Sequence, residues 1–319
     1  MLEFIDETEF GKTKIKVVGV GGAGNNAIRR MRKDGVQGVE LIGINTAIKD
    51  LGNPGEDMLQ IGAKLTKGLG AGARPDVGQR AAEESREAIA RKLEGADMVI
   101  VTCGMGGGTG TGAAPVVANI SRELGILTVA IVTKPFRFEG SVRARNAAWG
   151  IEKMSEVVDT LVVVPNDKLL IVLDKKATMT EAFEKGDEVL RQCVQGITEI
   201  INVKADINVD FADVRTVMTN NGMAHLGIGI GRGEDKAIKA VKLAIESPLL
   251  ETDISEATSL IVSVTGDISV IEVGDAVRYI EEKTGNNLNV ILGLRYDETM
   301  RDACSITVIA TGIGKRGYA

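Results

Sequence analysis

The chain has 319 residues, room for two domains, and 44% of them are hydrophobic, as in a globular protein with a sizeable core. A net charge of −6 and 3% aromatic residues argue against a nucleic-acid-binding surface. Three cysteines, one histidine and the lack of a long apolar run argue against a disulfide framework, a histidine-based metal site or catalytic triad, and direct membrane insertion. We therefore expect a protein of the reducing cytoplasm.

The first strand is predicted at residues 14–20, and it leads into the loop Gly21-Gly-Ala-Gly-Asn-Asn26 and a helix. Gly19, Gly21 and Gly24 have the G-x-G-x-x-G spacing of a dinucleotide-binding loop. The strand, turn and helix around them are the setting that this fingerprint requires. An NAD-dependent oxidoreductase is therefore one candidate.

The second predicted strand, residues 39–44, argues against that class of enzyme. It ends in Asn45 and Thr46, where a dinucleotide-binding fold usually carries an acidic ligand for the ribose. The fingerprint also leaves a second glycine loop, at residues 104–112, without a role. Two glycine loops at neighbouring strand ends suit a mononucleotide triphosphate better.

Residues 63–75 form a further glycine-rich loop, which carries positive charge and contains Ala71 and Gly72. We expect Asp76 to cap the helix that follows and this helix to run to about Leu93. Such a loop can order around a terminal phosphate, and it can equally be an ordinary surface crossover. The sequence fits both interpretations.

The most informative stretch is Gly104-Met-Gly-Gly-Gly-Thr-Gly-Thr-Gly112, between an apolar strand predicted at residues 98–103 and an apolar helix that follows. Glycine lets a backbone approach a ligand closely or reach φ > 0. Free N–H groups at a helix start attract anions, and Thr109 and Thr111 add hydroxyl donors. Because no Gly-Lys-Ser/Thr follows, the stretch predicts an anion site other than a Walker A loop.

Strands are predicted next at residues 126–132 and 161–164. Between them, Glu139 and Arg143 lie four residues apart and would share a helix face. They are either a surface ion pair, worth at most about 1 kcal/mol, or a pair that takes ribose hydroxyls and faces phosphate. Strands that alternate with helices predict a mostly parallel, Rossmann-like sheet with its ligand at the carboxyl ends of the strands.

A long helix is predicted over residues 178–203. Its polar side chains form one stripe, which consists of Glu184, Glu188, Gln192, Gln195 and Glu199. The apolar arc is wider than one core needs, so we expect the helix to be wedged between two domains. Phe183 and Asp187 share a face near its start, where a ring can stack on a base and a carboxylate can accept two guanine N–H groups. Spacing alone favours a core phenylalanine beside a solvated aspartate.

The long helix leads into an acidic stretch, Asp206-Ile-Asn-Val-Asp-Phe-Ala-Asp213. Taken alone, this pattern favours Asp210 as the cap of the next helix, with Asp213 in its first turn. Beyond residue 220 the pattern predicts a smaller α/β domain that shapes a subunit interface. Its four strands are expected at residues 224–230, 259–264, 288–294 and 306–310, and its helices at about 234–245 and 270–284.

Seven consecutive residues, Gly106-Gly-Gly-Thr-Gly-Thr-Gly112, resemble the glycine loop of the tubulin/FtsZ family of GTPases. The first glycine loop, residues 135–143, the long helix and the acidic stretch resemble it too. The resemblance is continuous from about residue 14 to 312 and points to the FtsZ branch. It implies an α/β fold with a GTP-binding domain at residues 1–177, a central helix at 178–203 and a C-terminal domain at 204–319.

The resemblance implies a cytoskeletal GTPase that polymerises head to tail and forms the division ring, in the cytoplasm at the division site. The residues that it assigns to phosphate and base are Gly21, Gly22, Ala23, Gly24, Asn25, Gly107, Gly108, Thr109 and Gly110. It assigns Ala71 and Gly72 to the γ-phosphate, Glu139 and Arg143 to ribose and phosphate, and Phe183 and Asp187, with Asn25, to guanine.

Catalysis, by the same resemblance, falls to the acidic stretch of the adjacent subunit. Asn208, Asp210 and Asp213 would polarise the attacking water. Mg²⁺ would bridge the β- and γ-phosphates, because a triphosphate needs its charge neutralised and the sequence shows no cage of carboxylates. A nucleotide-binding structural protein without turnover is the third candidate function.

The partners implied by the resemblance are further copies of the chain and other cell-division proteins, with no nucleic acid. Proteins of the FtsZ branch usually continue into a linker and a short partner-binding tail. This chain ends at Ala319, just past its last predicted strand, so we expect it to lack that tail and the adaptor binding that depends on it.

Overall fold

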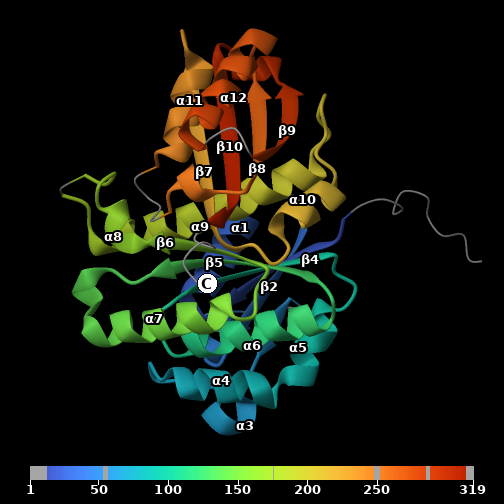
Figure 1. Ribbon diagram of the computed structural model, residues 1–319. Helices are drawn as coiled ribbons and strands as arrows, with labels where there is room; N and C mark the ends of the chain where they lie inside the picture. The colour runs from blue at the N-terminus through green and yellow to red at the C-terminus, as the bar shows by residue number, and fades with distance from the viewer. Residues whose placement is uncertain (1–12, 53–56, 175, 248–251, 285–287, 314–319) are drawn as a thin grey trace, which may run out of the picture.

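The computed structural model describes residues 13–52, 57–174, 176–247, 252–284 and 288–313. Its strands form one sheet in the order β3-β2-β1-β4-β5-β6-β7-β10-β8-β9 (Figure 1). The strands are β1 Ile15–Val20, β2 Val39–Asn45, β3 Met58–Gln60, β4 Met98–Gly104, β5 Leu127–Lys134, β6 Thr160–Pro165, β7 Gly222–Arg232, β8 Ser259–Gly266, β9 Asn289–Tyr296 and β10 Ala303–Ile313.

Helices fill most of the connections between these strands. In the first half of the chain they are α1 Gly21–Lys33, α2 Ile48–Leu51, α3 Ala63–Thr66, α4 Pro75–Glu84, α5 Arg86–Leu93, α6 Thr109–Glu123, α7 Ser141–Ser155 and α8 Asn166–Leu169. In the second half they are α9 Met179–Asn202, α10 Phe211–Met218, α11 Lys236–Ile245 and α12 Val270–Thr284. Among the described residues, no helix combines the length and apolar character that crossing a bilayer requires.

The first six strands are all parallel to their neighbours. One face of this half packs against α1, α9 and α10, and the other against α4, α5, α6 and α7 (Figure 1). A sheet covered on both faces needs strands that are apolar throughout, as β4 is. The expected Rossmann-like parallel sheet is thereby confirmed.

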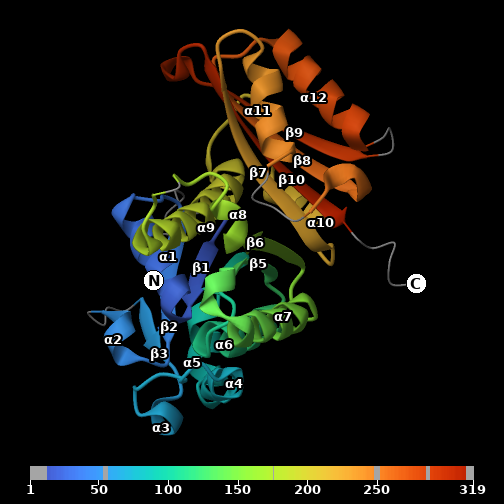
Figure 2. The same ribbon diagram turned by 90° about the vertical axis from the view of Figure 1, so that its left-hand side faces the viewer.

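The last four strands continue the same sheet but differ in direction. β10 runs antiparallel to β7 and β8, while β8 and β9 are parallel. Only Thr160–Gly222 and Leu161–Met223 pair across the junction of β6 and β7. α11 and α12 lie together over one face of this half (Figure 2). The smaller four-stranded α/β unit is confirmed, whereas the division at residues 177 and 203 stays an interpretation.

α9 lies between the two halves of the molecule, as its wide apolar arc predicts (Figure 1). Thr178 caps it: the Thr178 hydroxyl accepts from the Glu181 N–H at 3.2 Å, and the Glu181 carboxylate accepts from the Thr178 N–H at 2.6 Å. Val194 and Ile197 are buried in the core beneath it. The helix therefore connects the two halves through one hydrophobic cluster to which both contribute.

One predicted helix is wrong in detail. Residues 76–93 form two helices, α4 and α5, separated at Ser85, whose hydroxyl accepts from the Gly62 N–H at 3.0 Å. Asp76 is not the cap, because Pro75 takes the first helical position and Arg74 precedes it. The Asp76 carboxylate instead accepts from the Arg74 guanidinium at 2.8 Å.

Candidate functional site

A cavity of about 560 Å³ opens where β1, β2, β4, β5 and β6 end and α9 begins. The predicted nucleotide-binding residues that line it are Gly22, Ala23, Ala71, Gly72, Gly107, Gly108, Thr109, Gly110, Glu139, Arg143, Phe183 and Asp187. Parallel α/β sheets bind ligands at this edge. The fold thus brings segments more than a hundred residues apart in sequence to one cavity.

The two glycine loops meet at the floor of the cavity. Gly21 has φ +74°, and a Cβ there would lie 2.7 Å from the Gly110 N atom. Gly108 does not need the φ > 0 that glycine permits, because its φ is −83°. The constraint on Gly108 is space, because a Cβ would lie 2.8 Å from both the Ala71 Cβ and the Arg74 N atom.

The two threonines of the second loop have different roles. Thr109 lines the cavity, and its hydroxyl lies 2.7 Å from the Thr46 hydroxyl. Thr111 is fully buried, and its hydroxyl accepts from the Gly106 N–H at 2.8 Å. The expectation that Thr111 donates to a ligand is therefore wrong. It holds the loop at Gly106, where φ is +113°.

The loop that includes Ala71 and Gly72 lies against the second glycine loop. Gly68, Gly70, Gly72, Lys67 and Ala73 all have φ between +52° and +93°. This left-handed backbone turns the chain tightly enough for Ala71 and Gly72 to reach the cavity. Of the two interpretations that the sequence left open, this position favours a role at the terminal phosphate.

An aromatic cluster forms the wall of the cavity at the start of α9. Phe136 and Phe138 stack with ring centroids 4.9 Å apart, and Phe183 meets Phe136 edge-on at 5.4 Å. Phe136 is buried, whereas Phe138 and Phe183 remain exposed. A planar base can therefore pack against the Phe183 ring, whose position the other two rings fix.

Asp187 lies one turn after Phe183, on the same wall. Burial raises the pKa of its carboxyl to about 6, and Arg30 and Arg29 oppose that rise. None of the described residues donates a hydrogen bond to this carboxylate. The side chain is half-buried rather than fully solvated, and its carboxylate is an acceptor suited to paired N–H donors of a ligand.

Glu139 and Arg143 form an ion pair, but not on one helix as their spacing suggests. Glu139 ends a 3₁₀ turn, Arg137–Glu139, and α7 begins after Gly140, where φ is +97°. One Glu139 carboxylate oxygen accepts from the Phe136 N–H at 2.9 Å. Both side chains line the cavity, so this is more than a surface pair.

Three predicted residues of the first loop do not line the cavity: Gly21, Gly24 and Asn25. Gly24 packs against β4, where a Cβ would lie 2.6 Å from the Thr102 carbonyl oxygen. Asn25 is fully buried beside β2, and neither polar atom of its amide has a hydrogen-bond partner among the described residues. The role of Asn25 at guanine stays a prediction, and its amide is a buried polar group that the described residues leave unpaired.

The acidic stretch lies away from the cavity, beyond the far end of α9. The Asn208 side-chain oxygen accepts from the Ala205 N–H at 2.8 Å, and Asp210 caps α10 by accepting from the Asp213 N–H at 2.8 Å. Asp206 accepts from the Tyr296 N–H at 2.7 Å, which ties the stretch to β9. The predicted cap is confirmed, and all three predicted catalytic residues face a different end of the molecule from the cavity.

Comparisons with known proteins match both halves of the chain. The GTPase domain model of the Tubulin/FtsZ family matches residues 14–174, and the C-terminal domain model of the FtsZ family matches residues 222–314. An empty FtsZ dimer of M. jannaschii is 44% identical, with a TM-score of 0.89 over 96% of this chain and 90% of that chain. The chain belongs to the tubulin/FtsZ family.

More distant members of the same fold are the CetZ proteins of Haloferax volcanii. A CetZ2 protofilament with bound GTPγS is 22% identical, with a TM-score of 0.79 over 95% of this chain and 94% of that chain. A GDP-bound CetZ1 monomer is 21% identical, with a TM-score of 0.80 over 95% of both chains. These two likenesses bear on the fold, and the FtsZ match bears on the family.

Family membership settles the class of chemistry. The chain is a cytoskeletal GTPase that binds guanine nucleotide and hydrolyses GTP to GDP and phosphate. A dehydrogenase is thereby excluded, and so is a nucleotide-binding scaffold without turnover. The dinucleotide fingerprint at Gly19–Gly24 is a phosphate-loop geometry that both kinds of fold share.

The cavity is also lined by two asparagines that sequence reasoning did not assign to it. Asn45 ends β2 and Asn166 follows β6, and they are 2% and 7% exposed. The Asn45 side-chain nitrogen and the Asn166 side-chain oxygen have no hydrogen-bond partner among the described residues. A polar amide at the carboxyl end of a buried strand was the available signal. Asn45 entered the sequence argument only as a missing acid.

The donor set of this GTPase cavity does not form a metal cage. Among the described residues, no three histidine, cysteine or acidic side chains come close enough to hold a metal ion. Glu139 is already engaged by Arg143 and the Phe136 N–H. A divalent cation therefore fits here only if phosphate oxygens supply most of its ligands, which is how Mg²⁺ usually binds nucleotides.

Proposed function

We propose that this GTPase polymerises head to tail, and that the acidic stretch of one subunit completes the nucleotide site of the next. The observation that carries the proposal is the placement of the two sites on one chain. Asp187 is near the start of α9 and Asp210 lies beyond its end. About fifteen helical residues at 1.5 Å each separate them by more than about 20 Å. A nucleotide beside Asp187 is then out of reach of its own Asp210.

Both ends of the molecule also expose apolar side chains. Leu69, on the loop beside the cavity, is 84% exposed, and Phe138 and Val142 are exposed nearby. At the other end Ile207 and Tyr296 are exposed beside Asp206. Exposed apolar groups around both sites support a protein interface at each. A contact between two different surfaces is heterologous and repeats into an open filament.

Relatives of the chain assemble in ways that support this proposal. The M. jannaschii FtsZ structure is a dimer and the CetZ2 structure is a protofilament. The division ring, in the cytoplasm at the division site, is the filament function that the FtsZ branch suggests for this chain. Partners other than its own copies are other proteins of cell division.

In the assembled site, Gly107, Gly108 and the start of α6 hold phosphates through backbone N–H groups. Mg²⁺ would supply charge neutralisation to the phosphates here, with phosphate oxygens as most of its ligands. Asp210 of the adjacent subunit, with Asn208 and Asp213, orients and polarises the water that attacks the γ-phosphate. Glu139 and Arg143 face ribose and phosphate, and Phe183 and Asp187 bind guanine.

A mixing experiment tests completion between subunits. Asp210→Asn keeps an intact cavity, and Asp187→Ala keeps an intact acidic stretch. Each variant alone should hydrolyse GTP slowly, and the two co-assembled should recover activity at interfaces that pair the intact halves. The control is Asp210→Asn alone at the total protein concentration of the mixture. Normal turnover by Asp210→Asn alone, or the same rate per subunit in dilute monomer as in polymer, would contradict the proposal.

A further inference from the structure

α1 and α9 both begin at the cavity and run side by side from it. Gly22 and Ala23, at the start of α1, line the phosphate end of the cavity. Phe183 and Asp187, at the start of α9, line the base end. The axial position of one helix against the other therefore sets the distance between the two ends of the ligand site.

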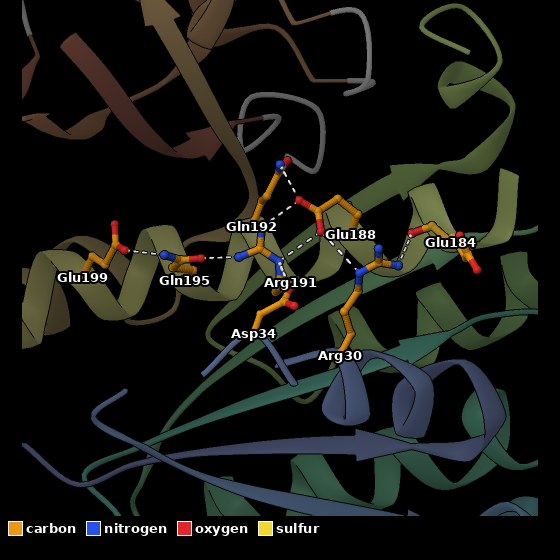
Figure 3. Close-up of polar contacts among 8 residues, drawn as sticks. All are labelled: Arg30, Asp34, Glu184, Glu188, Arg191, Gln192, Gln195 and Glu199. Atoms are coloured by element: carbon orange, nitrogen blue, oxygen red, sulfur yellow. Dashed lines mark hydrogen bonds and ion pairs between the residues drawn. The ribbon is translucent and has the colours of Figure 1, made fainter. Parts of the chain in front are cut away.

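A ladder of charged side chains joins these helices (Figure 3). Arg30 on α1 donates to the Glu184 carbonyl oxygen at 3.0 Å and lies 3.4 Å from the Glu188 carboxylate. Arg191 lies one turn beyond Glu188 on α9. Its guanidinium is 3.2 Å from the carboxylate of Asp34, which follows Arg30 by one turn at the end of α1. The Arg191 guanidinium also donates to Glu188 at 2.6 Å.

The order of these contacts makes the pairing parallel, because both residue numbers rise together. Asn202, at the end of α9, continues it by donating to the Gly38 carbonyl oxygen at 2.9 Å. We call Arg30, Asp34, Glu188 and Arg191 the α1–α9 ladder. It contains two positive and two negative groups, and the side chains of Arg191 and Glu188 are 16% and 20% exposed.

Apolar packing alone would not fix the axial position of α9 as firmly. Ile28 and Met31 of α1 belong to the same buried core as Val189 and Val194 of α9. Burial of apolar surface is non-directional, so it tolerates a small slide of one helix along another. Charge-assisted hydrogen bonds from a guanidinium group require a narrow range of distances and angles, so they do not tolerate such a slide.

We propose that the α1–α9 ladder is the spacer of the nucleotide site: it fixes the span between the phosphate-binding start of α1 and the base-binding start of α9. Arg30, Asp34, Glu188 and Arg191 are positioning residues that touch no ligand. This inference rests on the part of the proposed function that places the nucleotide in this cavity. Two linked fragments bind more tightly than either alone only when the protein holds their subsites at the matching distance.

The test compares a whole nucleotide with its two fragments. Dissociation constants are measured for GDP, guanosine and pyrophosphate with dilute protein, so that neither assembly nor hydrolysis enters. Arg30→Met combined with Asp34→Asn removes the contacts that cross between the helices and leaves the Glu188–Arg191 pair. Because Arg30 also lowers the pKa of Asp187, all constants are measured at pH 8, where that carboxyl is ionised with or without Arg30. Gln192→Ala is the matched control, because Gln192 donates to Glu188 at 2.8 Å within α9 and crosses to no other helix.

We expect the double variant to bind GDP at least roughly tenfold more weakly, while guanosine and pyrophosphate change by less than about twofold. The Gln192→Ala control should bind all three ligands normally. Unchanged GDP affinity in the double variant overturns the inference. A loss in either fragment equal to the loss in GDP overturns it too, because the ladder would then support a single subsite. Asp34→Asn alone replaces one carboxylate oxygen with an NH2 group. It gives the same comparison if the double variant does not fold.

Failure of the proposed function gives a different result. If the nucleotide bound elsewhere, Asp187→Ala would leave guanosine affinity unchanged. If assembly or completion between subunits were wrong, the mixing experiment would fail while the fragment comparison stayed intact.

Discussion

The cavity and the acidic stretch differ in whether the chain itself supplies hydrogen-bond partners for their polar side chains. At the cavity, one amide atom each of Asn45 and Asn166 is buried without a hydrogen-bond partner among the described residues, and burial raises the pKa of the half-buried Asp187 carboxyl. A buried polar group without a partner costs about 1–3 kcal/mol. This end of the molecule is therefore less stable than it would be with apolar side chains, and a ligand can restore what is lost.

Polar side chains of the acidic stretch already have hydrogen-bond partners within the chain. Asn208, Asp210 and Asp206 each accept a hydrogen bond from a backbone N–H, and all three residues are exposed. The carboxylates of Asp206 and Asp210 remain hydrated, so holding them in place costs little free energy. The comparison teaches that the cavity holds buried amide atoms that a polar ligand could pair, while polar side chains of the acidic stretch are already paired by backbone N–H groups.

The largest expected effect is on base selectivity at the cavity. If Asp187 accepts two guanine N–H groups, adenine leaves the buried carboxylate unpaired, and such sites reject the wrong analogue by roughly 10⁴-fold. Asp187→Ala should lose most of this difference. Calorimetric titration with GTP and ATP measures it. Equal affinities for both nucleotides in the unmodified protein would remove the contrast drawn above.

Steric closure of the cavity should have the next largest effect. A Cβ added at Gly107 meets no atom within 4 Å, so Gly107→Ala should fold normally while its methyl group enters the cavity. We expect nucleotide affinity to fall by roughly 100-fold, about 3 kcal/mol, because phosphate contacts to the backbone N–H groups are displaced. Gly274→Ala in α12, where a Cβ also meets nothing within 4 Å, is the matched control. Equal affinity in both variants would mean that this loop is only a turn.

Much of the fold and most of the cavity could be predicted from the sequence. Continuous apolar runs such as residues 98–103 identify strands covered on both faces, and glycine loops follow the carboxyl ends of such strands by connection alone. The long helix was equally clear, because a polar stripe and a wide apolar arc indicate its extent and its place between two halves.

What sequence could not give was the direction of individual side chains. Asn25 and Thr111 stand in glycine loops, yet both are fully buried and neither lines the cavity. Asn45 and Asn166 look like ordinary strand ends, yet they line the cavity. The pKa of Asp187 depends on burial and on the opposing charges of Arg29 and Arg30 from α1, which no local pattern reports. Helix breaks at Ser85 and Gly140 depend on tertiary hydrogen bonds and a single positive φ.

A pH series separates the two ends with a smaller effect. Burial raises the pKa of Asp187 to about 6 in the unliganded protein, and guanine needs the ionised carboxylate. Guanosine affinity should therefore be constant above about pH 7 and fall by up to about tenfold per unit below pH 6, as the carboxyl takes up a proton. Guanosine avoids the titration of phosphate. Asp187→Asn should show no such slope, and a flat profile from pH 7 to 5 in the unmodified protein would contradict the assignment.

The smallest expected effect is on folding stability, and it reverses sign between the two ends. Asp210 caps α10, so Asp210→Ala should lower the free energy of unfolding by about 1 kcal/mol, while Asp210→Asn, which can still cap, should change it by a few tenths. Asp187→Asn should instead stabilise the nucleotide-free protein at pH 7. A carboxyl whose folded pKa is raised destabilises the fold increasingly as pH rises from its unfolded value towards about 6, and an amide removes that cost. Urea unfolding of the three variants without nucleotide measures these differences. A loss of stability in Asp187→Asn comparable to that in Asp210→Ala would mean that the cavity, like the acidic stretch, is already satisfied without a ligand.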